Sequence, residues 1–347
     1  NESIKTILVT STTLSSSNII KKYSFKKVIH QFYPIDHYFF TNKFLNYWKP
    51  NLAVFIESEI WPSMFISLKK KSISLVLLNA RIRKRSFLRW FKLNKFSNFI
   101  FSKIDFAYPQ NYETKYFLKK LGVKKIFKSS NLKFIENKLD KDNEVSKSLQ
   151  LKFKKYKIWT AASTHFEEEK FIGKTHILLK KLHKNLITII IPRHIDKIEK
   201  IISDLEKLNL KILTHSSKKK KFKNVDIYIV DTYGDTKKFF KLSPTVFMGK
   251  STTFIEESLK KNSGQNPIEA AQLGAKVLHG PFVENFNDVY KKLTELKITK
   301  KINNSKDIIK EISFKKSDKS LKKFKKLGKL ILFKTKNELV KILNNEI

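Results

Sequence analysis

The sequence predicts an α/β protein built from two similar blocks. Short runs rich in β-branched and aromatic residues alternate with amphipathic stretches along the 347 residues, a pattern typical of parallel sheets covered by helices. The predicted strands are apolar on both faces, as expected when helices cover both faces of a sheet. A polar segment at Asn137–Ser148 interrupts the alternation and predicts a linker. Two such blocks indicate two Rossmann-like domains facing a cleft.

The first block is predicted to span residues 1–140. Its expected strands are Ile4–Thr10, Lys27–Phe32, Leu52–Ile56, Ile73–Asn79, Asp105–Pro109 and Val123–Lys128. Its expected helices are Trp61–Lys71, Ser86–Ser102 and Gln110–Leu121. The chain starts with Asn1 rather than Met and enters a strand almost at once, so we expect an N-terminal part to be missing.

The second block is predicted to span residues 149–347. Its expected strands are Tyr156–Ala162, Leu186–Pro192, Lys211–Thr214, Asp226–Val230, Pro244–Met248 and Ala275–His279. Its expected helices are Phe166–His183, Ile195–Leu208, Asp235–Leu242, Pro267–Leu273 and Asn285–Leu296. Thr164 and Glu167 match a capping box at the start of one helix. The basic tail from Ser305 is expected to be helical, with its terminal helix returning to the first domain.

Composition restricts the function classes. With no cysteine, the chain has no disulfides, no zinc-thiolate site and no cysteine nucleophile. No apolar run reaches the roughly 18 residues that a membrane-spanning helix needs. The 72 Lys and Arg residues against 31 Asp and Glu fit an anionic partner, or they fit compositional drift, because lysines are scattered over every predicted solvated face. We favour drift, although such a surface still attracts anionic lipid.

A loop that turns into a helix, Asn262–Ala271, is the most informative stretch of the chain. It contains a glycine for an unusual backbone shape, a strong N-cap in Asn266, a proline suited to the first helical position and an acid, Glu269, in the first turn. A helix start at the carboxyl edge of a parallel sheet suits a phosphate, and the carboxylate can take ribose hydroxyls. The alternative is an ordinary connection between a helix and a strand.

Other polar clusters also follow predicted strands. Glu57 and Glu59 stand between a strand and a helix that starts at a proline, and one of them can act as acid, base or electrostatic stabiliser. The alternative is that they complement the helix dipole. Arg193 ends a strand of the second block, where its guanidinium can bind a phosphate, and Lys133 closes the first block. For each cation the alternative is a solvated surface charge.

The order of these motifs resembles one known family. In the first block the motifs are Val9-Thr10-Ser11-Thr12-Thr13, Glu57-Ser58-Glu59-Ile60-Trp61-Pro62, Asn79-Ala80-Arg81 and Ser130-Asn131-Leu132-Lys133-Phe134. In the second they are Ala161–Glu169, Ile191-Pro192-Arg193-His194, Gly234-Asp235-Thr236, Gln265–Ala271 and Gly280-Pro281 with Asn285-Phe286. From about Ile7 to about Tyr290 the chain is similar to the 3-deoxy-D-manno-octulosonic acid (Kdo) transferases.

The resemblance implies a GT-B glycosyltransferase, with an acceptor-binding domain first and a CMP-Kdo-binding domain second. It implies an inverting transfer of Kdo from CMP-Kdo to a 6′-hydroxyl of a lipid A precursor, without metal or cofactor, at the cytoplasmic face of the inner membrane, where the enzyme is peripheral or anchored. The expected partners are CMP-Kdo, the lipid A precursor and an anionic membrane surface. No nucleic acid is expected, since the aromatic-basic motifs of nucleic-acid-binding proteins are missing.

Residue by residue, the resemblance implies the following roles. Glu57 and Lys133 match the family's transition-state stabilisers, and Glu57 rather than Glu59 is our choice within the pair. The donor-binding residues it implies are Pro192, Arg193, Lys237, Lys238, Phe239, Asn266, Pro267, Ile268 and Glu269. The family's general base is a Glu in a Gly-Glu motif, which has no match before Ile7, so we expect it upstream of Asn1.

The chain also departs from the family pattern. The family's glycine pair at the end of its Phe-x-Gly strand is reduced to Gly249-Lys250 here, and the segment after Gly234-Asp235-Thr236 reads Lys237-Lys238-Phe239. These changes leave open an inactive relative. Two further alternatives remain open, a GT-B glycosyltransferase that uses a UDP- or ADP-sugar, and a basic nucleic-acid-binding protein.

Overall fold

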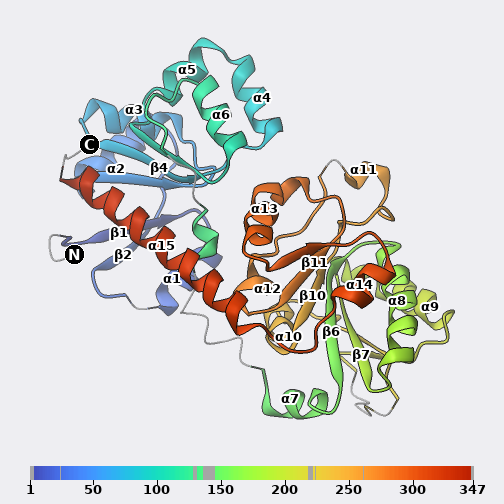
Figure 1. Ribbon diagram of the computed structural model, residues 1–347. Helices are drawn as coiled ribbons and strands as arrows, with labels where there is room; N and C mark the ends of the chain where they lie inside the picture. Colours follow the sequence, from blue (N-terminus) through green and yellow to red (C-terminus); the bar gives the residue numbers. More distant parts are fainter. Residues whose placement is uncertain are drawn as a thin grey trace. The chain divides into compact units, whose positions relative to one another are not determined.

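The computed structural model describes residues 4–23, 25–127, 131–135, 145–217, 222, 224–260 and 262–344. The chain divides into two compact units. Unit 1 consists of Asn1–Leu132 and Ile331–Ile347, and unit 2 consists of Lys133–Leu330. Both are α/β units with parallel sheets (Figure 1).

Unit 1 contains two parallel sheets. One has three strands in the order β3-β4-β5, and the other has two, β1 and β2. The strands are β1 (Ile7–Ser11), β2 (Val28–Phe32), β3 (Leu52–Ile56), β4 (Ser74–Ala80) and β5 (Phe106–Pro109). The helices are α1 (Leu14–Lys22), α2 (Tyr38–Trp48), α3 (Pro62–Lys70), α4 (Lys84–Lys92), α5 (Lys95–Phe101) and α6 (Tyr112–Lys120). Strand β4 is buried along most of its length because helices cover it, as predicted for a parallel sheet.

Four elements of unit 1 differ from the sequence prediction. The helix expected at Ser86–Ser102 is two helices, because Asn94 adopts a φ of 37° that no helix continues through. The strand expected at Val123–Lys128 is reduced, among its described residues, to one isolated bridge between Ala107 and Ile126. Helices α1 and α2 were not predicted, since a serine-rich run and an aromatic-rich run both have modest helix propensity.

Unit 2 is built around a seven-stranded, entirely parallel sheet in the order β12-β11-β10-β6-β7-β9-β8. Its strands are β6 (Lys157–Thr164), β7 (Leu186–Pro192), β8 (Ile212–Thr214), β9 (Ile227–Ile229), β10 (Thr245–Met248), β11 (Lys276–His279) and β12 (Thr299–Lys301). The α-helices are α7 (Lys147–Phe153), α8 (Glu168–Leu182), α9 (Ile198–Glu206), α10 (Thr236–Leu242), α11 (Glu257–Lys260), α12 (Ile268–Gln272), α13 (Asn287–Glu295) and α14 (Ser305–Glu311). Strands β6, β7 and β10 lie at the centre of this sheet (Figure 1). In open parallel sheets, ligands bind beside the loops that follow the carboxyl ends of such strands.

The core of unit 2 depends on the central strands. Every residue of β7 is buried, and so are most residues of β6, as expected for strands covered on both faces. Trp159 is fully buried, and its indole N–H donates to the Thr188 hydroxyl at 2.7 Å. His176 Nδ1 lies 2.8 Å from the same hydroxyl. A buried polar network of this kind fixes the position of β6 against β7 and α8.

The tail contains a 26-residue helix, α15 (Asp318–Leu343), which confirms its predicted helical character. Its first part belongs to unit 2, where Phe324 is buried beside Phe134 with ring centroids 5.8 Å apart. Its last part belongs to unit 1, where Ile342 packs in a cluster with Val76 and Phe106. None of the helices in the described ranges is both long and apolar enough to cross a bilayer.

Candidate active site

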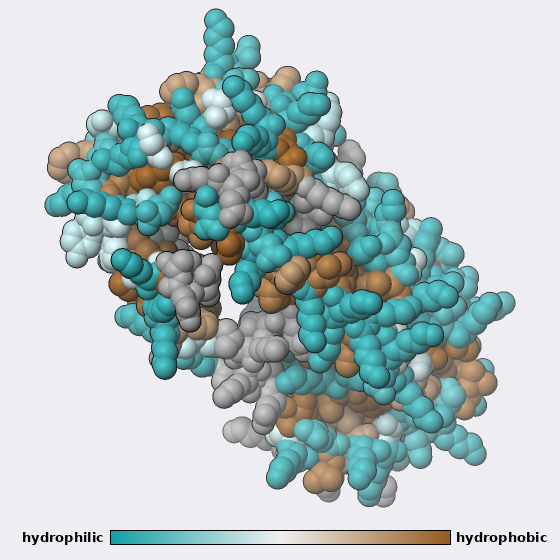
Figure 2. Space-filling model, turned by 60° about the vertical axis from the view of Figure 1, so that its left-hand side comes forward, coloured by the Kyte–Doolittle hydropathy of each residue, from teal (hydrophilic) through white to brown (hydrophobic). Residues whose placement is uncertain are grey.

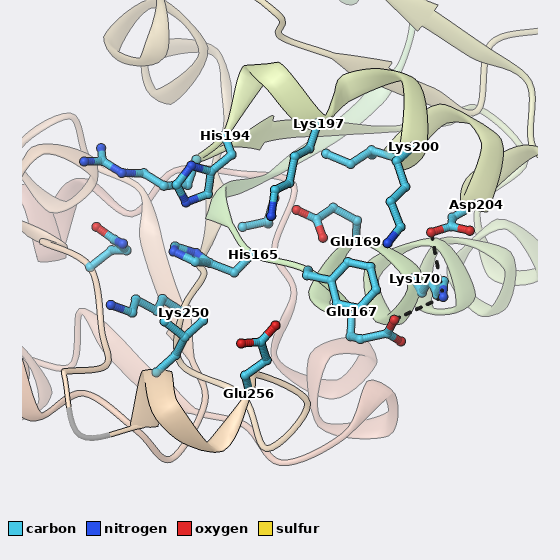
Figure 3. Close-up of a pocket in the computed structure, with 16 residues that line it drawn as sticks. His165, Glu167, Glu169, Lys170, His194, Lys197, Lys200, Asp204, Lys250 and Glu256 are labelled. Atoms are coloured by element: carbon cyan, nitrogen blue, oxygen red, sulfur yellow. Dashed lines mark hydrogen bonds and ion pairs between the residues drawn. The ribbon is translucent and has the colours of Figure 1, made fainter.

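A pocket of about 460 Å³ lies in unit 2, where the segments that follow β6, β7 and β10 converge (Figure 3). Parallel strands end at the same edge of their sheet, so loops from different parts of the chain meet there. Its lining residues are Thr164, His165, Phe166, Glu167, Glu169, Lys170, Arg193, His194, Lys197, Lys200, Ile201, Asp204, Lys250, Glu256, Leu259 and Gln265.

The carboxyl group of Glu168 joins two of the segments that line this pocket. The side chain is fully buried, and it accepts hydrogen bonds from the backbone N–H groups of His165, Lys250, Ser251 and Thr252 at 2.6 to 3.1 Å. The Thr252 hydroxyl donates a further bond at 3.0 Å. Burial raises the pKa of Glu168, and these hydrogen bonds oppose that effect. The network joins the start of α8 to the loop after β10.

The backbone at the pocket is close-packed and strained. Ser163, Glu167 and Lys250 have φ values of 54°, 71° and 55°, in the left-handed region that L-residues rarely adopt. A Cβ on Gly249 would lie 2.5 Å from the Ser163 carbonyl oxygen and 2.8 Å from the Glu168 carboxylate. Glycine is therefore needed here for β10 to approach β6. Such strain persists only where surrounding contacts enforce it, and it clusters at functional sites.

The capping box predicted at Thr164 and Glu167 is wrong. Thr164 is the last residue of β6, and Glu167 is itself the N-cap of α8 without a side-chain capping hydrogen bond. Glu167 instead pairs with Lys170 at 3.1 Å. The spacing of Thr164 and Glu167 matches a capping box. However, it is the next residue, Glu168, whose side chain forms hydrogen bonds, and it binds the loop after β10.

Charges of both signs line the pocket. Lys197, Lys200 and His194 come from the segment after β7, whereas His165 and Glu169 come from the segment after β6 (Figure 3). Lys200 lies over the Phe166 ring, 4.1 Å from its centroid. Lys170 is held between Glu167 and Asp204, at 3.1 and 3.7 Å.

The two buried titratable groups in the pocket have shifted pKa values. Burial raises the pKa of Glu169 to about 7, so its carboxyl group is partly protonated near neutral pH. Burial lowers the pKa of His165 to about 4, with further lowering by Lys250, His194 and Arg193, so its imidazole is neutral. A carboxyl group and a neutral imidazole beside cations can exchange hydrogen bonds with hydroxyl groups of a ligand.

The predicted donor-binding residues lie at the same edge of the sheet. Arg193 lines the pocket directly after Pro192, which ends β7. Asn266 Oδ1 accepts from the Ile268 N–H at 3.2 Å, although α12 begins at Ile268 and not at Pro267. Glu269 is half exposed and lies 3.7 Å from the Lys237 ammonium group, which brings the starts of α10 and α12 together.

Other members of the predicted donor set contribute differently. Phe239 is fully buried against His215 and Tyr228, so it can reach a ligand only through its backbone. The Ile268 side chain is also buried. Lys238 pairs with Asp235 at 2.7 Å. Five side chains of this set are polar and at least partly exposed, those of Arg193, Lys237, Lys238, Asn266 and Glu269.

The candidate residues of unit 1 follow β3 and β4. Glu57 has a φ of 60°, its N–H donates to the Leu78 carbonyl, and its own carbonyl accepts from the Arg81 N–H. Strand β3 ends at Ile56, so the spacing of Glu57 and Glu59 does not put both on one side of a continuing strand. Glu59 is held by the Trp61 indole N–H at 2.7 Å.

Lys133 belongs to unit 2. It lies in the short helix η1 (Leu132–Phe134), and its carbonyl oxygen accepts a hydrogen bond from the Gln272 side chain of α12 at 3.0 Å. Ser130, the first residue of the motif that contains Lys133, lies outside the described residues. Within the described part of the chain, no group of three or more His, Asp or Glu residues is arranged to hold a metal ion.

The site residues that sequence reasoning missed are His165, Glu168, Glu169, Lys197 and Lys250. The run of acids directly after a buried strand was a signal, since three carboxylates at the start of a helix are more than its dipole needs. The separate roles of these acids were not predictable, because their partners lie on other loops.

The chain has the GT-B class of fold. Each of its two units contains parallel strands, and the loops that line the pocket follow the carboxyl ends of the larger sheet. A putative UDP-N-acetylglucosamine 2-epimerase from Listeria monocytogenes has a similar solved structure, with a TM-score of 0.56 at 12% identity over 96% of this chain and 88% of that one. The corresponding epimerase from Neisseria meningitidis gives 0.54 at 14% identity, over 93% and 86%.

Sequence comparisons identify the family. The family model for 3-deoxy-D-manno-octulosonic-acid transferase (kdotransferase) matches residues 1–136. The chain is 32% identical over 299 residues to 3-deoxy-D-manno-octulosonic acid transferase of Rickettsia bellii, covering 86% of this chain and 69% of that protein. The Rickettsia felis enzyme gives the same identity and the same share of this chain, but the chain spans only 62% of its length. The chain belongs to the 3-deoxy-D-manno-octulosonic acid transferase family.

The role of Glu168 can be tested by substitution. Glu168→Gln places an NH₂ group against backbone N–H donors, and we expect it to lower the free energy of unfolding by roughly 2–4 kcal/mol. Glu167→Gln is the matched control, since its side chain is 39% exposed and a surface ion pair contributes at most about 1 kcal/mol. Urea unfolding measures the free energy of unfolding of both variants. An equal decrease in the two variants would contradict the proposed role of Glu168 in joining the loops after β6 and β10.

Proposed function

We propose that this chain contains the two α/β units of a glycosyltransferase. The enzyme transfers Kdo from CMP-Kdo to a hydroxyl group of a lipid A precursor. Membership of the Kdo transferase family over 86% of the chain is the observation that carries the proposal. The cluster of Arg193, Lys237, Asn266 and Glu269 at one edge of the unit 2 sheet supports it.

In this proposal unit 2 binds the nucleotide. The Arg193 guanidinium binds the phosphate through charge-assisted hydrogen bonds. Glu269, half exposed beside Lys237, accepts hydrogen bonds from the ribose hydroxyls. Asn266 shapes the turn that presents Glu269, because its side-chain oxygen accepts a hydrogen bond from the Ile268 N–H, although Pro267 rather than Asn266 is the N-cap of α12. Pro192, Pro267 and the buried Ile268 and Phe239 hold these segments in place.

The proposed transfer is an inverting displacement. The acceptor hydroxyl oxygen attacks the anomeric carbon of Kdo, the bond from that carbon to the phosphate oxygen breaks, and CMP leaves with the electron pair. The hydroxyl proton passes to a base for which we assign no residue of this chain. Positive charge grows on the sugar ring and negative charge on the phosphate, so a carboxylate from Glu57 and the ammonium of Lys133 would each stabilise the transition state.

Nucleotide binding separates this proposal from a transferase that uses a UDP- or ADP-sugar. We expect wild-type protein to bind CMP more tightly than UDP or ADP, and Arg193→Ala and Glu269→Ala each to weaken CMP binding about 10-fold, the loss of one charge-assisted hydrogen bond. Arg89→Ala and Glu199→Ala, at exposed positions on other helices, serve as controls. Calorimetry showing unchanged CMP affinity in both site variants would remove the assignment.

Lys133 should act on the rate of transfer more than on nucleotide binding. An interaction made mainly in the transition state appears in kcat, so in the full-length enzyme Lys133→Ala should lower kcat on the order of 10²–10³-fold and change the Kd for CMP little. Steady-state assays with CMP-Kdo and a lipid A precursor, together with CMP calorimetry, measure the two effects. Wild-type turnover in the variant would leave Lys133 as a solvated lysine, and a pure loss of CMP affinity would move it into the nucleotide site.

We also propose that unit 1 contacts an anionic membrane surface, at the cytoplasmic face of the inner membrane. Helix α4 has no buried residue, and α4, α5 and their connection expose the apolar residues Leu88, Phe91, Leu93, Phe96 and Phe99. The same segment is rich in Lys and Arg. Apolar side chains flanked by cations are typical of interfacial binding. Hydrophilic residues cover most of the face drawn in Figure 2, with apolar patches between them, so total charge alone does not locate this surface.

Vesicle binding tests the membrane proposal. We expect cosedimentation with phosphatidylglycerol vesicles and little with phosphatidylcholine vesicles. Phe91→Ser combined with Leu88→Ser should weaken binding at least 10-fold, since burying each such side chain contributes roughly 1.5–3 kcal/mol. Leu182→Ser, at an apolar position of unit 2 that is 62% exposed, is the control. Equal binding by the double variant and the control would contradict the assignment of α4.

A further inference from the structure

The segment that contains Lys133 takes its hydrogen-bond partners from a distant helix. The short helix η1 spans only Leu132–Phe134, and the last carbonyl groups of a helix have no partners within it. The Gln272 side chain supplies such partners, because its Nε2 donates to the Lys133 carbonyl at 3.0 Å and to the Ile135 carbonyl at 3.1 Å. A glutamine amide has two N–H donors, so one donor serves each carbonyl group.

The same segment also packs against α15. The Phe134 ring is buried, and its centroid lies 5.8 Å from that of Phe324. A Cβ on Gly328 would lie 2.6 Å from the Phe134 carbonyl oxygen, so a glycine is needed for the helix to approach this closely. Two helices of unit 2 therefore hold the backbone around Lys133, α12 by hydrogen bonds and the first part of α15 by packing.

Helix α12 is tied to α10 at both of its ends. At its start, Glu269 lies 3.7 Å from an ammonium group of α10. At its end, the Lys316 ammonium group donates to the Leu273 carbonyl at 2.7 Å and to a carbonyl of the last turn of α10 at 2.8 Å. These carbonyl groups are among those that a helix leaves without partners at its end. Gln272 therefore lies on a helix whose position is set by contacts other than its own.

The two functional ends of α12 are close together. Glu269 and Gln272 are three residues apart, so their side chains are neighbours on the helix surface. Glu269 is the residue proposed to bind the ribose, and Gln272 holds the backbone of the lysine proposed to act in the transition state. The sequence gave no sign of this connection, because the amide and the two carbonyl groups are 139 and 137 residues apart.

From these contacts we infer that Gln272 is a positioning residue for Lys133, whose backbone its amide group fixes against α12. The inference rests on the proposed function for the role of Lys133 in transfer, whereas the hold on its backbone rests on the two hydrogen bonds. Gln272 touches no reacting atom, so its whole effect on the rate passes through Lys133. A misplacement of about 1 Å can cost on the order of 10²-fold in rate, and loss of this contact should therefore appear in kcat.

Turnover and nucleotide binding by the full-length enzyme test the inference. Gln272→Met removes both N–H donors and keeps a side chain of similar length. We expect it to lower kcat at least about 10-fold and to change the Kd for CMP less than about twofold. When it is combined with Lys133→Ala, kcat should equal that of Lys133→Ala alone, because a residue that acts only through Lys133 then has nothing left to position.

The matched control is Gln150→Met. The Gln150 amide also donates to a backbone carbonyl, that of Val145 at 2.8 Å, but it lies in α7. This variant should retain wild-type kcat and CMP affinity. Circular dichroism melting curves confirm that each variant is folded.

Hydrogen exchange gives a readout that does not depend on activity. Mass spectrometry of peptic peptides measures amide exchange in residues 131–135 of this chain. Exchange there should be at least about 10-fold faster in Gln272→Met than in wild type or Gln150→Met, because the segment has lost two of the contacts that keep it closed.

The possible results separate the inference from the proposed function. If Lys133→Ala loses turnover but Gln272→Met does not, or if the double variant is slower than Lys133→Ala, the inference is overturned and the role of Lys133 stands. Wild-type turnover in Lys133→Ala would remove that role, and the inference with it. If the wild-type enzyme does not transfer Kdo from CMP-Kdo, the proposed function falls and exchange alone decides: faster exchange in Gln272→Met supports the hold on Lys133, and unchanged exchange overturns it.

Discussion

The buried carboxylate of Glu168 is the interaction on which the site of unit 2 depends. It replaces the water it loses on burial with four backbone N–H donors and one hydroxyl donor. These donors belong to two loops, one after β6 and one after β10, and the carboxyl group joins them. At the same junction a Cβ on Gly249 would clash with the backbone of Ser163 and Thr164, and Lys250 has a left-handed backbone. The two segments that line the pocket are thus joined by one buried carboxyl group whose hydrogen bonds are satisfied.

The central architecture could be predicted from the sequence because a strand that is buried on both faces consists mostly of apolar residues. Strands such as β7 and β10 consist mostly of apolar residues, and the pattern of the tail is typical of a helix. The predicted helix boundaries were wrong where the backbone angle of a single residue ends a helix. Asn94 splits one expected helix, and nothing in its neighbours' hydrophobicity reports a φ of 37°. Glu168 could not be distinguished from Glu167 and Glu169, because three of its four backbone donors lie 82 to 84 residues further along the chain.

The predicted donor residues illustrate a second limit of sequence motifs. A matching position identifies a residue without saying whether its side chain or its packing matters. Glu269 reaches the surface beside Lys237, whereas Phe239 and Ile268 are buried in the core. The net charge of +41 is equally uninformative about the pocket, which mixes cations with carboxyl groups. Local arrangement, rather than composition, therefore determines what ligand this edge of the sheet can accept.

Both units use the same backbone device to direct residues out of a central strand. The pairing register shifts between Leu78 and Ala80 in β4 and between Ala162 and Thr164 in β6. The residue between them, Asn79 or Ser163, has a left-handed φ of 51° or 54°. Such a bulge rotates the residues that follow. In β4 the Asn79 side chain then accepts the Leu132 N–H at 3.0 Å, and in β6 the chain turns into His165 and Glu168. Strain at these positions is maintained by the neighbouring strands, which hold Arg81 against Glu57 and Arg193 against Thr164 by backbone hydrogen bonds. The two candidate sites therefore arise from one structural solution, in which a bulge at the end of a buried strand positions the polar residues after it.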